Sequence, residues 1–423
     1  MIEIEEEYGQ AEKILLVARN TDRTVPDETV IREISSLADT AGFTIAGAVV
    51  LTRNEPAARY AMGSGKAKEI AGYAAELDAS YIIFDFEITP TQQRNWEALS
   101  SCICMDRQEL VIRIFAERAM TREAVLQIEL ARLTYALPRL AHTYSALSRQ
   151  RGGRYGTKGA GETQLELDRR SIISRMAQIR RELKTVRSDR AVRRKRRERS
   201  DVPSCAIVGY TNAGKSSLLN AVTGASVAAE NKLFATLDPT TRRFTSVTGR
   251  SILLTDTVGF IRNLPHTLID AFRSTLEEAV FADGIIILLD ASDEDIKLHL
   301  ETTYEVLKEI GAENQYMLQV LNKIDCVDEF TRERLHAEYP RAVQISTRTG
   351  EGMQELLSRL DLLFSGEEHL YKLPAARSDL VSYAHREGTV TGVVYEADYI
   401  LLKAHTDGRL AAVLKEFEYA EKK

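Results

Sequence analysis

The chain has 423 residues, of which 44% are hydrophobic and 28% charged, and its formal net charge is -6. This length favours two to four domains of ordinary globular composition. No apolar run approaches the ~20 residues of a membrane span, and the acidic N-terminus does not resemble a secretory signal, so we expect a cytoplasmic protein without a membrane span. We also expect buried, reduced thiols, because zinc-ligand spacing is missing from the four cysteines, Cys102, Cys104, Cys205 and Cys326.

The first part of the chain alternates strand-like and helix-like runs. We predict strands at 14–18, 43–51, 81–86 and 102–105, and helices at 27–40, 66–77 and 91–100. Pro26 followed by Asp27 suits a helix start, and Gly42 suits a helix end. Such alternation predicts a small parallel α/β domain, which we place at 1–115.

Two long helices with apolar stripes follow. The first is predicted at 117–137 and the second begins near Thr163, where Thr163 and Glu166 have the spacing of a capping box. The stripes are Leu126, Leu130, Leu133 and Leu137 in the first helix, and Ile172, Met176, Ile179, Leu183 and Val186 in the second. Two striped helices close in sequence predict an antiparallel helical hairpin, placed at 116–200.

The segment between these helices, 149–162, is rich in glycine and basic residues. It is either a flexible connector or a basic loop that orders on a phosphate-rich partner. The strongly basic run 169–199 favours the second interpretation, since it concentrates positive charge on an acidic protein. The candidate RNA contacts are Arg149, Arg151, Arg154, Lys158, Arg169 and Arg170.

A P-loop GTPase domain with a mostly parallel sheet is predicted at 201–365. A strand runs into a GxxxxGKS motif and then a helix. Glycines let the backbone N–H groups wrap a phosphate, Lys215 reaches the β- and γ-phosphates, and the Ser216 hydroxyl is a Mg²⁺ ligand. The motif comprises Gly209, Tyr210, Thr211, Asn212, Ala213, Gly214, Lys215 and Ser216.

A DxxG motif, Asp256–Thr257–Val258–Gly259, follows at the end of another predicted strand. Asp256 is expected to hold Mg²⁺, and the Gly259 N–H to contact the γ-phosphate and sense its loss. The carboxyl ends of strands are where α/β sheets bind ligands. The motif therefore predicts the second switch of the same site.

The base-binding motif is Asn322–Lys323–Ile324–Asp325. The Asp325 carboxylate can accept two hydrogen bonds from guanine, and adenine lacks that donor pair, so the motif favours GTP over ATP. Lys323 would lie along the base and Asn322 would tie this loop to the P-loop. A final base-contact loop is predicted at Ser346, Thr347 and Arg348, where Ser-Ala-Lys is the common form.

The first switch is predicted in 233–241, where a threonine should complete the Mg²⁺ shell. Thr236 is preferred, and Thr240 and Thr241 remain alternatives. The nucleotide contacts predicted here are Phe234, Ala235, Thr236, Leu237 and Asp238.

The catalytic candidates are Lys215, Thr236 and Gly259, and one further group is missing. Phe260 stands where many switch GTPases carry a glutamine that orients the attacking water, and a phenyl ring cannot hydrogen-bond that water. We therefore expect slow basal hydrolysis until a partner completes the site. The last segment, 366–423, has two strand-like runs and is predicted as a small C-terminal α+β domain.

In these motifs the chain resembles the HflX family of ribosome-associated GTPases. The resemblance rests on GYTNAGKSSLLN (209–220), LFATLDPTTR (233–242), DTVGFIRNLPH (256–266) and NKID, and on the more diagnostic 117–140 and GAGETQLELDRR (159–170). It departs from the family at Ala160, where Pro is frequent, and in the less regular 102–115. The resemblance implies a cytoplasmic enzyme that hydrolyses GTP to GDP and phosphate, with Thr236 as the Mg²⁺ threonine.

The resemblance also implies the partner. Family members bind the large ribosomal subunit and its RNA, which stimulates hydrolysis, and some split stalled or hibernating ribosomes. Our leading hypothesis is therefore a monomeric, GTP-driven ribosome-splitting or ribosome-rescue enzyme. The alternative is a GTP-regulated RNA or ribosome-assembly switch in which hydrolysis only resets the state. An RNA-modification partner GTPase and a second nucleotide site in the N-terminal domain are less favoured.

Overall fold

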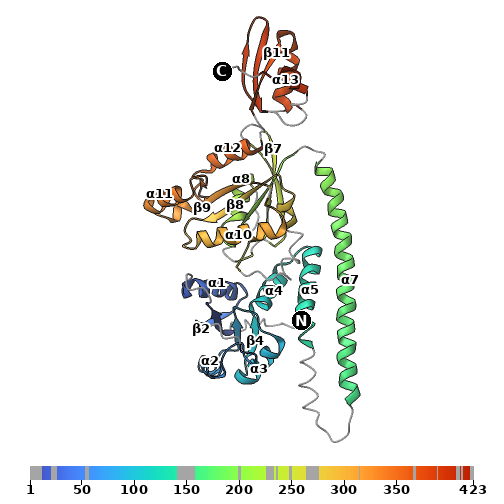
Figure 1. Cartoon of the computed structure of the whole chain (residues 1–423), viewed down its shortest axis with the longest axis vertical. Helices are drawn as coiled ribbons and strands as arrows, with labels where there is room; N and C mark the ends of the chain where they lie inside the picture. Colours follow the sequence, from blue (N-terminus) through green and yellow to red (C-terminus); the bar gives the residue numbers. More distant parts are fainter. Residues whose placement is uncertain are drawn as a thin grey trace, which may run out of the picture.

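The computed structural model places four units along the chain (Figure 1). It describes residues 12–20, 26–52, 57–140, 158–198, 202–224, 233–234, 237–246, 250–262, 276–313, 315–364, 368–387, 389–405, 410 and 413–419. In this part of the chain, none of the helices has the length and apolar character needed to span a membrane.

The first unit is a four-stranded parallel sheet in the order β2-β1-β3-β4. Its elements are β1 (Lys13–Arg19), α1 (Asp27–Thr40), β2 (Thr44–Leu51), α2 (Ser64–Glu76), β3 (Tyr81–Phe84), α3 (Pro90–Ser100) and β4 (Ile103–Asp106). Alternate residues of β1 enter different cores, Ile14 and Leu16 on one face, Leu15 and Val17 on the other. The predicted parallel α/β architecture is confirmed.

The predicted single helix at 117–137 is wrong at its start. The chain forms α4 (Arg107–Arg118), which the sequence analysis missed, and then α5 (Arg122–Ala136). Thr121 separates them because its extended backbone lets its side chain accept a hydrogen bond from the Ala124 N–H and cap α5. Capping chemistry at Thr121 therefore decides the break.

The second helix also begins earlier than predicted. Helix α7 runs from Lys158 to Glu198, so Thr163 lies inside it and does not cap it, and the predicted loop loses 158–162 to the helix. The remaining loop residues, 149–157, lie outside the described residues. Helix α7 does not need a capping signal at Thr163, because residues later in α7 pack on α5 and stabilise the helix.

Helices α5 and α7 form the second unit, and their antiparallel pairing is as predicted (Figure 1). Leu126 of α5 packs with Ile179 and Leu183 of α7. Two ion pairs show that the helices run in opposite directions. Arg122 lies 3.0 Å from Glu182, whereas Glu129, which is later in α5, lies 2.7 Å from Arg175, which is earlier in α7.

The third unit is a six-stranded sheet in the order β10-β9-β8-β5-β7-β6, parallel except for the antiparallel edge strand β6. Its elements are β5 (Ser204–Gly209), α8 (Lys215–Thr223), β6 (Thr240–Thr245), β7 (Ser251–Asp256), β8 (Gly284–Asp290), α10 (Ile296–Ile310), β9 (Tyr316–Asn322), the 3-10 turn η1 (Ile324–Cys326), α11 (Glu329–Glu338), β10 (Val343–Gln344) and α12 (Met353–Phe364). The mostly parallel sheet is as predicted, and it brings the carboxyl ends of β5, β7, β8 and β9 to one edge.

The fourth unit contains an antiparallel sheet in the order β11-β13-β12. It comprises β11 (Glu368–Pro374), η2 (Ala375–Arg377), α13 (Ser378–Glu387), β12 (Thr389–Tyr395), β13 (Tyr399–His405) and η3 (Lys415–Phe417). The sequence predicted β12 and β13. It predicted an α+β unit but did not place β11 and α13, whose apolar residues Tyr371, Leu373 and Ala384 join the core of this unit.

The cysteine prediction holds at three positions. Cys102, Cys104 and Cys205 are free and buried, and burial raises the pKa of the Cys205 thiol. Cys326 is free but exposed, which contradicts the expectation that all four are buried. It lies in η1, in a loop beyond the end of β9, where the sheet no longer covers the chain.

Candidate functional site

The loop between β5 and α8 has a backbone that requires glycine at both ends. Gly209 has φ 148° and Gly214 has φ 93°. A Cβ on Gly209 would overlap the Leu288 carbonyl, and one on Gly214 would overlap the Asn322 side chain. Since L side chains rarely adopt these φ values and no space is left for them, the spacing of the motif follows from the fold.

Lys215 is the first residue of α8, and its buried amine turns back toward the loop. Its Nζ donates to the Gly209 carbonyl at 3.2 Å and to the Tyr210 carbonyl at 2.7 Å. Burial lowers the pKa of Lys215 to about 8, against the opposing effect of Asp256. The amine is therefore mostly charged at neutral pH and is held inside the loop that would cradle a phosphate.

Ser216 and Asp256, the two described candidates for Mg²⁺ binding, are in direct contact. The Ser216 Oγ donates to the Asp256 Oδ2 at 2.6 Å. Hard oxygen donors of this kind, a hydroxyl and a carboxylate beside a phosphate loop, fit Mg²⁺. The buried Thr257 hydroxyl instead donates to the Ile207 carbonyl of β5 at 2.8 Å.

The third candidate ligand, Thr236, lies outside the described residues. Of its alternatives, Thr240 pairs with Asp256 across β6 and β7, and the Thr241 hydroxyl lies 2.9 Å from that of Thr255. The choice among the three threonines therefore stays a prediction.

Gly259 lies directly against the loop after β5. A Cβ there would lie 2.7 Å from the Thr211 Cγ2 and 3.0 Å from the Lys215 Nζ. Two backbone hydrogen bonds join the segments, Phe260 N to Gly209 O at 3.0 Å and Thr211 N to Phe260 O at 2.9 Å. The Phe260 ring is fully buried in the core, which agrees with the expectation that it does not orient a water.

The Asn322 side chain joins the loop after β5 to the loop after β10. Its Nδ2 donates to the Ala213 carbonyl at 2.9 Å, and its Oδ1 accepts from the Thr347 N–H at 3.1 Å. Asn322 is fully buried, so both contacts are protected from water. The loop that precedes Lys215 and the loop that carries Thr347 are therefore held together by Asn322, three residues before Asp325.

Asp325 is held in place from two sides. Its Oδ1 accepts from the Ser346 hydroxyl at 2.6 Å, and its Oδ2 lies 2.7 Å from the Arg348 Nη2. The Ser346 hydrogen bond, and then Arg348, lower the pKa of Asp325, so it is a carboxylate at neutral pH. Lys323 has φ 64° and its Nζ lies 2.6 Å from the Asp290 Oδ2. The buried Ile324 anchors η1.

Comparison with known proteins agrees with this geometry. Residues 28–116 match the family described as GTP-binding GTPase N-terminal, 118–197 the GTP-binding GTPase middle region, and 204–323 the 50S ribosome-binding GTPase family. A GTPase HflX from Akkermansia muciniphila is 45% identical over 420 residues, covering 96% of each chain. The chain belongs to the HflX GTPase family. It is therefore a P-loop enzyme that hydrolyses GTP.

Other relatives have similar coverage. The GTPase HflX of Escherichia coli K12 is 41% identical over 356 residues, or 83% of each chain. Among solved structures, a GTP-binding protein from Sulfolobus solfataricus in complex with GDP is 25% identical, covers 84% of this chain and 98% of its own, and superposes with a TM-score of 0.43.

In this HflX-family chain, the described part of the predicted first switch contacts α4 and the start of α5. Phe234 contacts Phe115 of α4, with ring centroids 4.4 Å apart, and Leu237 is buried. Asp238 accepts from the Thr121 N–H at 3.0 Å and from its hydroxyl at 2.5 Å. The structure thus directs Phe234 toward α4 and Asp238 toward the start of α5, while Ala235 lies outside the described residues.

Only some of the candidate RNA contacts lie within the described residues. Arg169 and Arg170 are exposed on α7, and Arg170 makes a 3.1 Å pair with Glu166. Lys158 begins α7, and Arg149, Arg151 and Arg154 lie outside the described residues. Nothing buries the two described arginines, so they are accessible to a polyanion.

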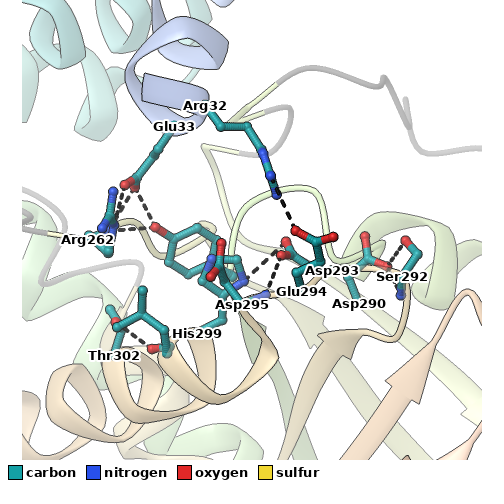
Figure 2. A network of polar contacts seen from close by, with 12 residues as sticks. Arg32, Glu33, Arg262, Asp290, Ser292, Asp293, Glu294, Asp295, His299 and Thr302 are labelled. Carbon is teal, nitrogen blue, oxygen red and sulfur yellow. Dashed lines mark hydrogen bonds and ion pairs between the residues drawn. The ribbon is translucent and has the colours of Figure 1, made fainter. Parts of the chain in front are cut away.

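Sequence reasoning missed a buried polar cluster between the first and third units of this HflX-family chain, and Figure 2 shows the part of it around Glu33 and Arg262. We call it the Glu33 cluster, and it consists of Glu33, Asp85, Arg107, Tyr210 and Arg262. Of its members, Tyr210 and Arg262 lie in motifs recognised in the sequence, whereas Glu33 and Asp85 do not. A single sequence carries no signal that could pair residues separated by up to 229 positions.

Proposed function

We propose that the chain binds GTP with Mg²⁺ across one continuous site and uses GTP binding and hydrolysis to act on ribosomes. The observation that carries the nucleotide part is the double contact of Asn322, which joins the loop of Lys215 to the loop of Thr347. This arrangement supports phosphate binding at one end and guanine binding at the other.

Each residue then has a role that its position supports. Lys215 and the loop N–H groups hold the β- and γ-phosphates, and the Gly259 N–H contacts the γ-phosphate. Asp325 accepts from guanine, with Ser346 fixing its orientation. Ser216 and Asp256 would hold Mg²⁺, together with the predicted Thr236, and Mg²⁺ neutralises charge on the transferred phosphoryl group.

The ribosome part rests on the family and on charge. One matching family is described as 50S ribosome-binding, and the hairpin presents exposed Arg169 and Arg170 on α7. We propose that the GTP-bound chain, a cytoplasmic monomer, places this hairpin against RNA of the large ribosomal subunit. Splitting or rescue would follow from hairpin insertion, and the subunit would complete the site that Phe260 leaves without a water-orienting side chain.

Sedimentation with purified large subunits tests this proposal. The intact chain should co-sediment with a non-hydrolysable GTP analogue and much less with GDP. Reversing charge at Arg169 and Arg170 to Glu should weaken binding and reduce its salt dependence, because fewer phosphate contacts release fewer counterions. The matched control reverses the exposed Arg334 and Arg341 on the third unit. Equal binding in all nucleotide states, unaffected by either pair, would contradict the proposal.

The alternative is a GTP-regulated RNA or ribosome-assembly switch in which hydrolysis only resets the state. Its supporting observation is the buried Phe260, whose ring cannot orient a water, so that hydrolysis would depend on a partner. Light scattering of whole ribosomes separates the two functions. Splitting with GTP favours the leading proposal, whereas binding to free subunits without any splitting favours the alternative.

A further inference from the structure

Helix α1 of the first unit reaches the third unit through the side chain of Glu33 (Figure 2). The Glu33 Oε1 accepts from the Arg262 backbone N–H at 3.0 Å and also from the Tyr210 hydroxyl, and its Oε2 accepts from the Arg262 Nε at 2.7 Å. One carboxylate therefore contacts both the loop after β5 and the segment that follows Gly259.

Arg107 completes the Glu33 cluster and balances its charge. Its Nη2 donates to the Glu33 Oε1 and to the Arg262 carbonyl, both at 2.8 Å, and its Nη1 donates to the Asp85 Oδ1 at 2.5 Å. Two carboxylates thus face two guanidinium groups, and the side chains of Glu33, Asp85 and Arg107 are at most 10% exposed. Buried, multiply hydrogen-bonded charges of this kind hold one geometry, because any shift leaves a charge uncompensated.

The segment between Gly259 and Arg262 is itself held in place, so that fixing Arg262 also restricts the position of Gly259. Phe260 and Ile261 are buried, and Phe260 is hydrogen-bonded to Gly209 and Thr211 through its backbone. Three residues of chain span at most ~11 Å. Gly259 is therefore fixed on one side by the loop after β5 and, three residues on, by Glu33.

We propose that Glu33 is a positioning residue that holds the backbone of Gly259 ready to contact the γ-phosphate. The inference rests on the proposed GTP site and adds a residue from the first unit to it. Without Glu33, GTP binding must supply the free energy that orders the 259–262 segment, which weakens the affinity for GTP. GDP has no γ-phosphate for the Gly259 N–H to contact, so its affinity should not change. By reciprocity, the γ-phosphate strengthens the contact between the two units.

The test measures affinity of the full chain for GDP and for the β,γ-imido analogue of GTP. We expect Glu33→Gln to weaken the analogue about five- to tenfold, the range of a modest coupling, and to leave GDP within about twofold. The ratio of the two affinities is the readout, because general loss of structure would weaken both nucleotides. An unchanged ratio in a folded Glu33→Gln protein would overturn the inference.

The neighbouring Arg32→Gln variant is the matched control. Arg32 also joins the two units, since its Nη2 lies 3.5 Å from the Glu294 Oε2 (Figure 2), but both side chains are mostly exposed. Exposed pairs contribute little, and this one does not touch the 259–262 segment. We therefore expect both affinities to stay at wild-type values.

Two further variants keep the test decisive if Glu33→Gln fails to fold. Tyr210→Phe removes the hydroxyl that donates to Glu33 and accepts from the Arg262 N–H at 2.9 Å. Its ring can still stack on His299, with ring centroids 3.7 Å apart, and the variant should change the ratio about two- to threefold in the same direction. In the double variant with Tyr210→Phe and Arg262→Gln, the logarithm of the ratio should change by less than the sum of the two single changes, since both substitutions act through Glu33. Full additivity would count against the inference. A wild-type chain that binds neither nucleotide would instead refute the proposed GTP site itself.

Discussion

At the scale of single residues, the base site depends on one oriented carboxylate. Asp325 is fixed by Ser346 and is ionised at neutral pH. In Asp325→Asn, an N–H₂ group competes for the position that should accept from guanine, so GTP affinity should fall at least ~100-fold without a gain for ATP. A fluorescent-nucleotide titration measures this.

The matched control for this prediction is Asp328→Asn. Asp328 caps α11 by accepting from the Thr331 N–H at 2.9 Å, and Asn caps helices about as well as Asp. This variant should bind GTP like the wild type. If Asp325→Asn also bound like the wild type, Asp325 would not be the guanine contact.

Glu33 should also make the stability of the chain depend on pH. Burial alone would raise the pKa of Glu33, but Arg107 and Arg262 outweigh burial and lower it from 4.5 to about 2. A carboxyl whose pKa is lowered by folding stabilises the native state above its unfolded value, and this contribution is lost as pH falls from 4.5 toward 2. The difference in melting temperature between wild type and Glu33→Gln should therefore be constant from pH 5 to 7 and shrink below pH 4.5. A difference that grows on acidification would contradict this assignment.

At the scale of elements, the contact between α5 and α7 depends on a narrow apolar stripe. Ile179 is fully buried against Leu126 of α5. Replacing it with Ala should destabilise the hairpin by about 2–5 kcal/mol. Ile173, on the same helix but 46% exposed, should tolerate Ala within about 0.5 kcal/mol. Chemical denaturation followed by a probe on α7 measures both, and equal effects would mean that the stripe is not the interface.

Thr121 joins two elements, since it caps α5 and donates two hydrogen bonds to Asp238. Thr121→Ala should cost about 1 kcal/mol through the lost cap and should increase hydrogen exchange near 237–238. Thr121→Ser keeps the hydroxyl and should restore both. Failure of Ser to restore the exchange pattern would show that the hydroxyl does not hold Asp238.

At the scale of the whole molecule, the fourth unit has a core of its own. Its buried cluster is drawn from residues 371–414, none of which belongs to the sheet that carries the nucleotide site. A chain ending at residue 364 should therefore keep its GDP and GTP affinities within about twofold, since a unit with its own core can be removed without exposing another. Equilibrium binding measures this, and a large loss would show that the fourth unit supports the site.

The sequence alone determined the motif chemistry and the main architecture. The GxxxxGKS, DxxG and NKxD motifs and the alternating or striped apolar patterns are local signals, because one loop or one element face produces each of them. Those signals predicted the parallel sheets, the hairpin and the GTPase family. The break at Thr121 and the early start of α7 were missed because a cap or a packed neighbour, and not the apolar period, sets where each helix begins.

Only the tertiary structure decided which distant groups meet. Asn322 reaches Ala213 across 109 positions, and Glu33 reaches Arg262 across 229 positions. Such partners carry no periodic pattern, and a buried acid looks like any helical Glu until the fold removes it from water. The physical reason is that burial and charge pairing are properties of the assembled molecule, whereas propensity and spacing are properties of the chain.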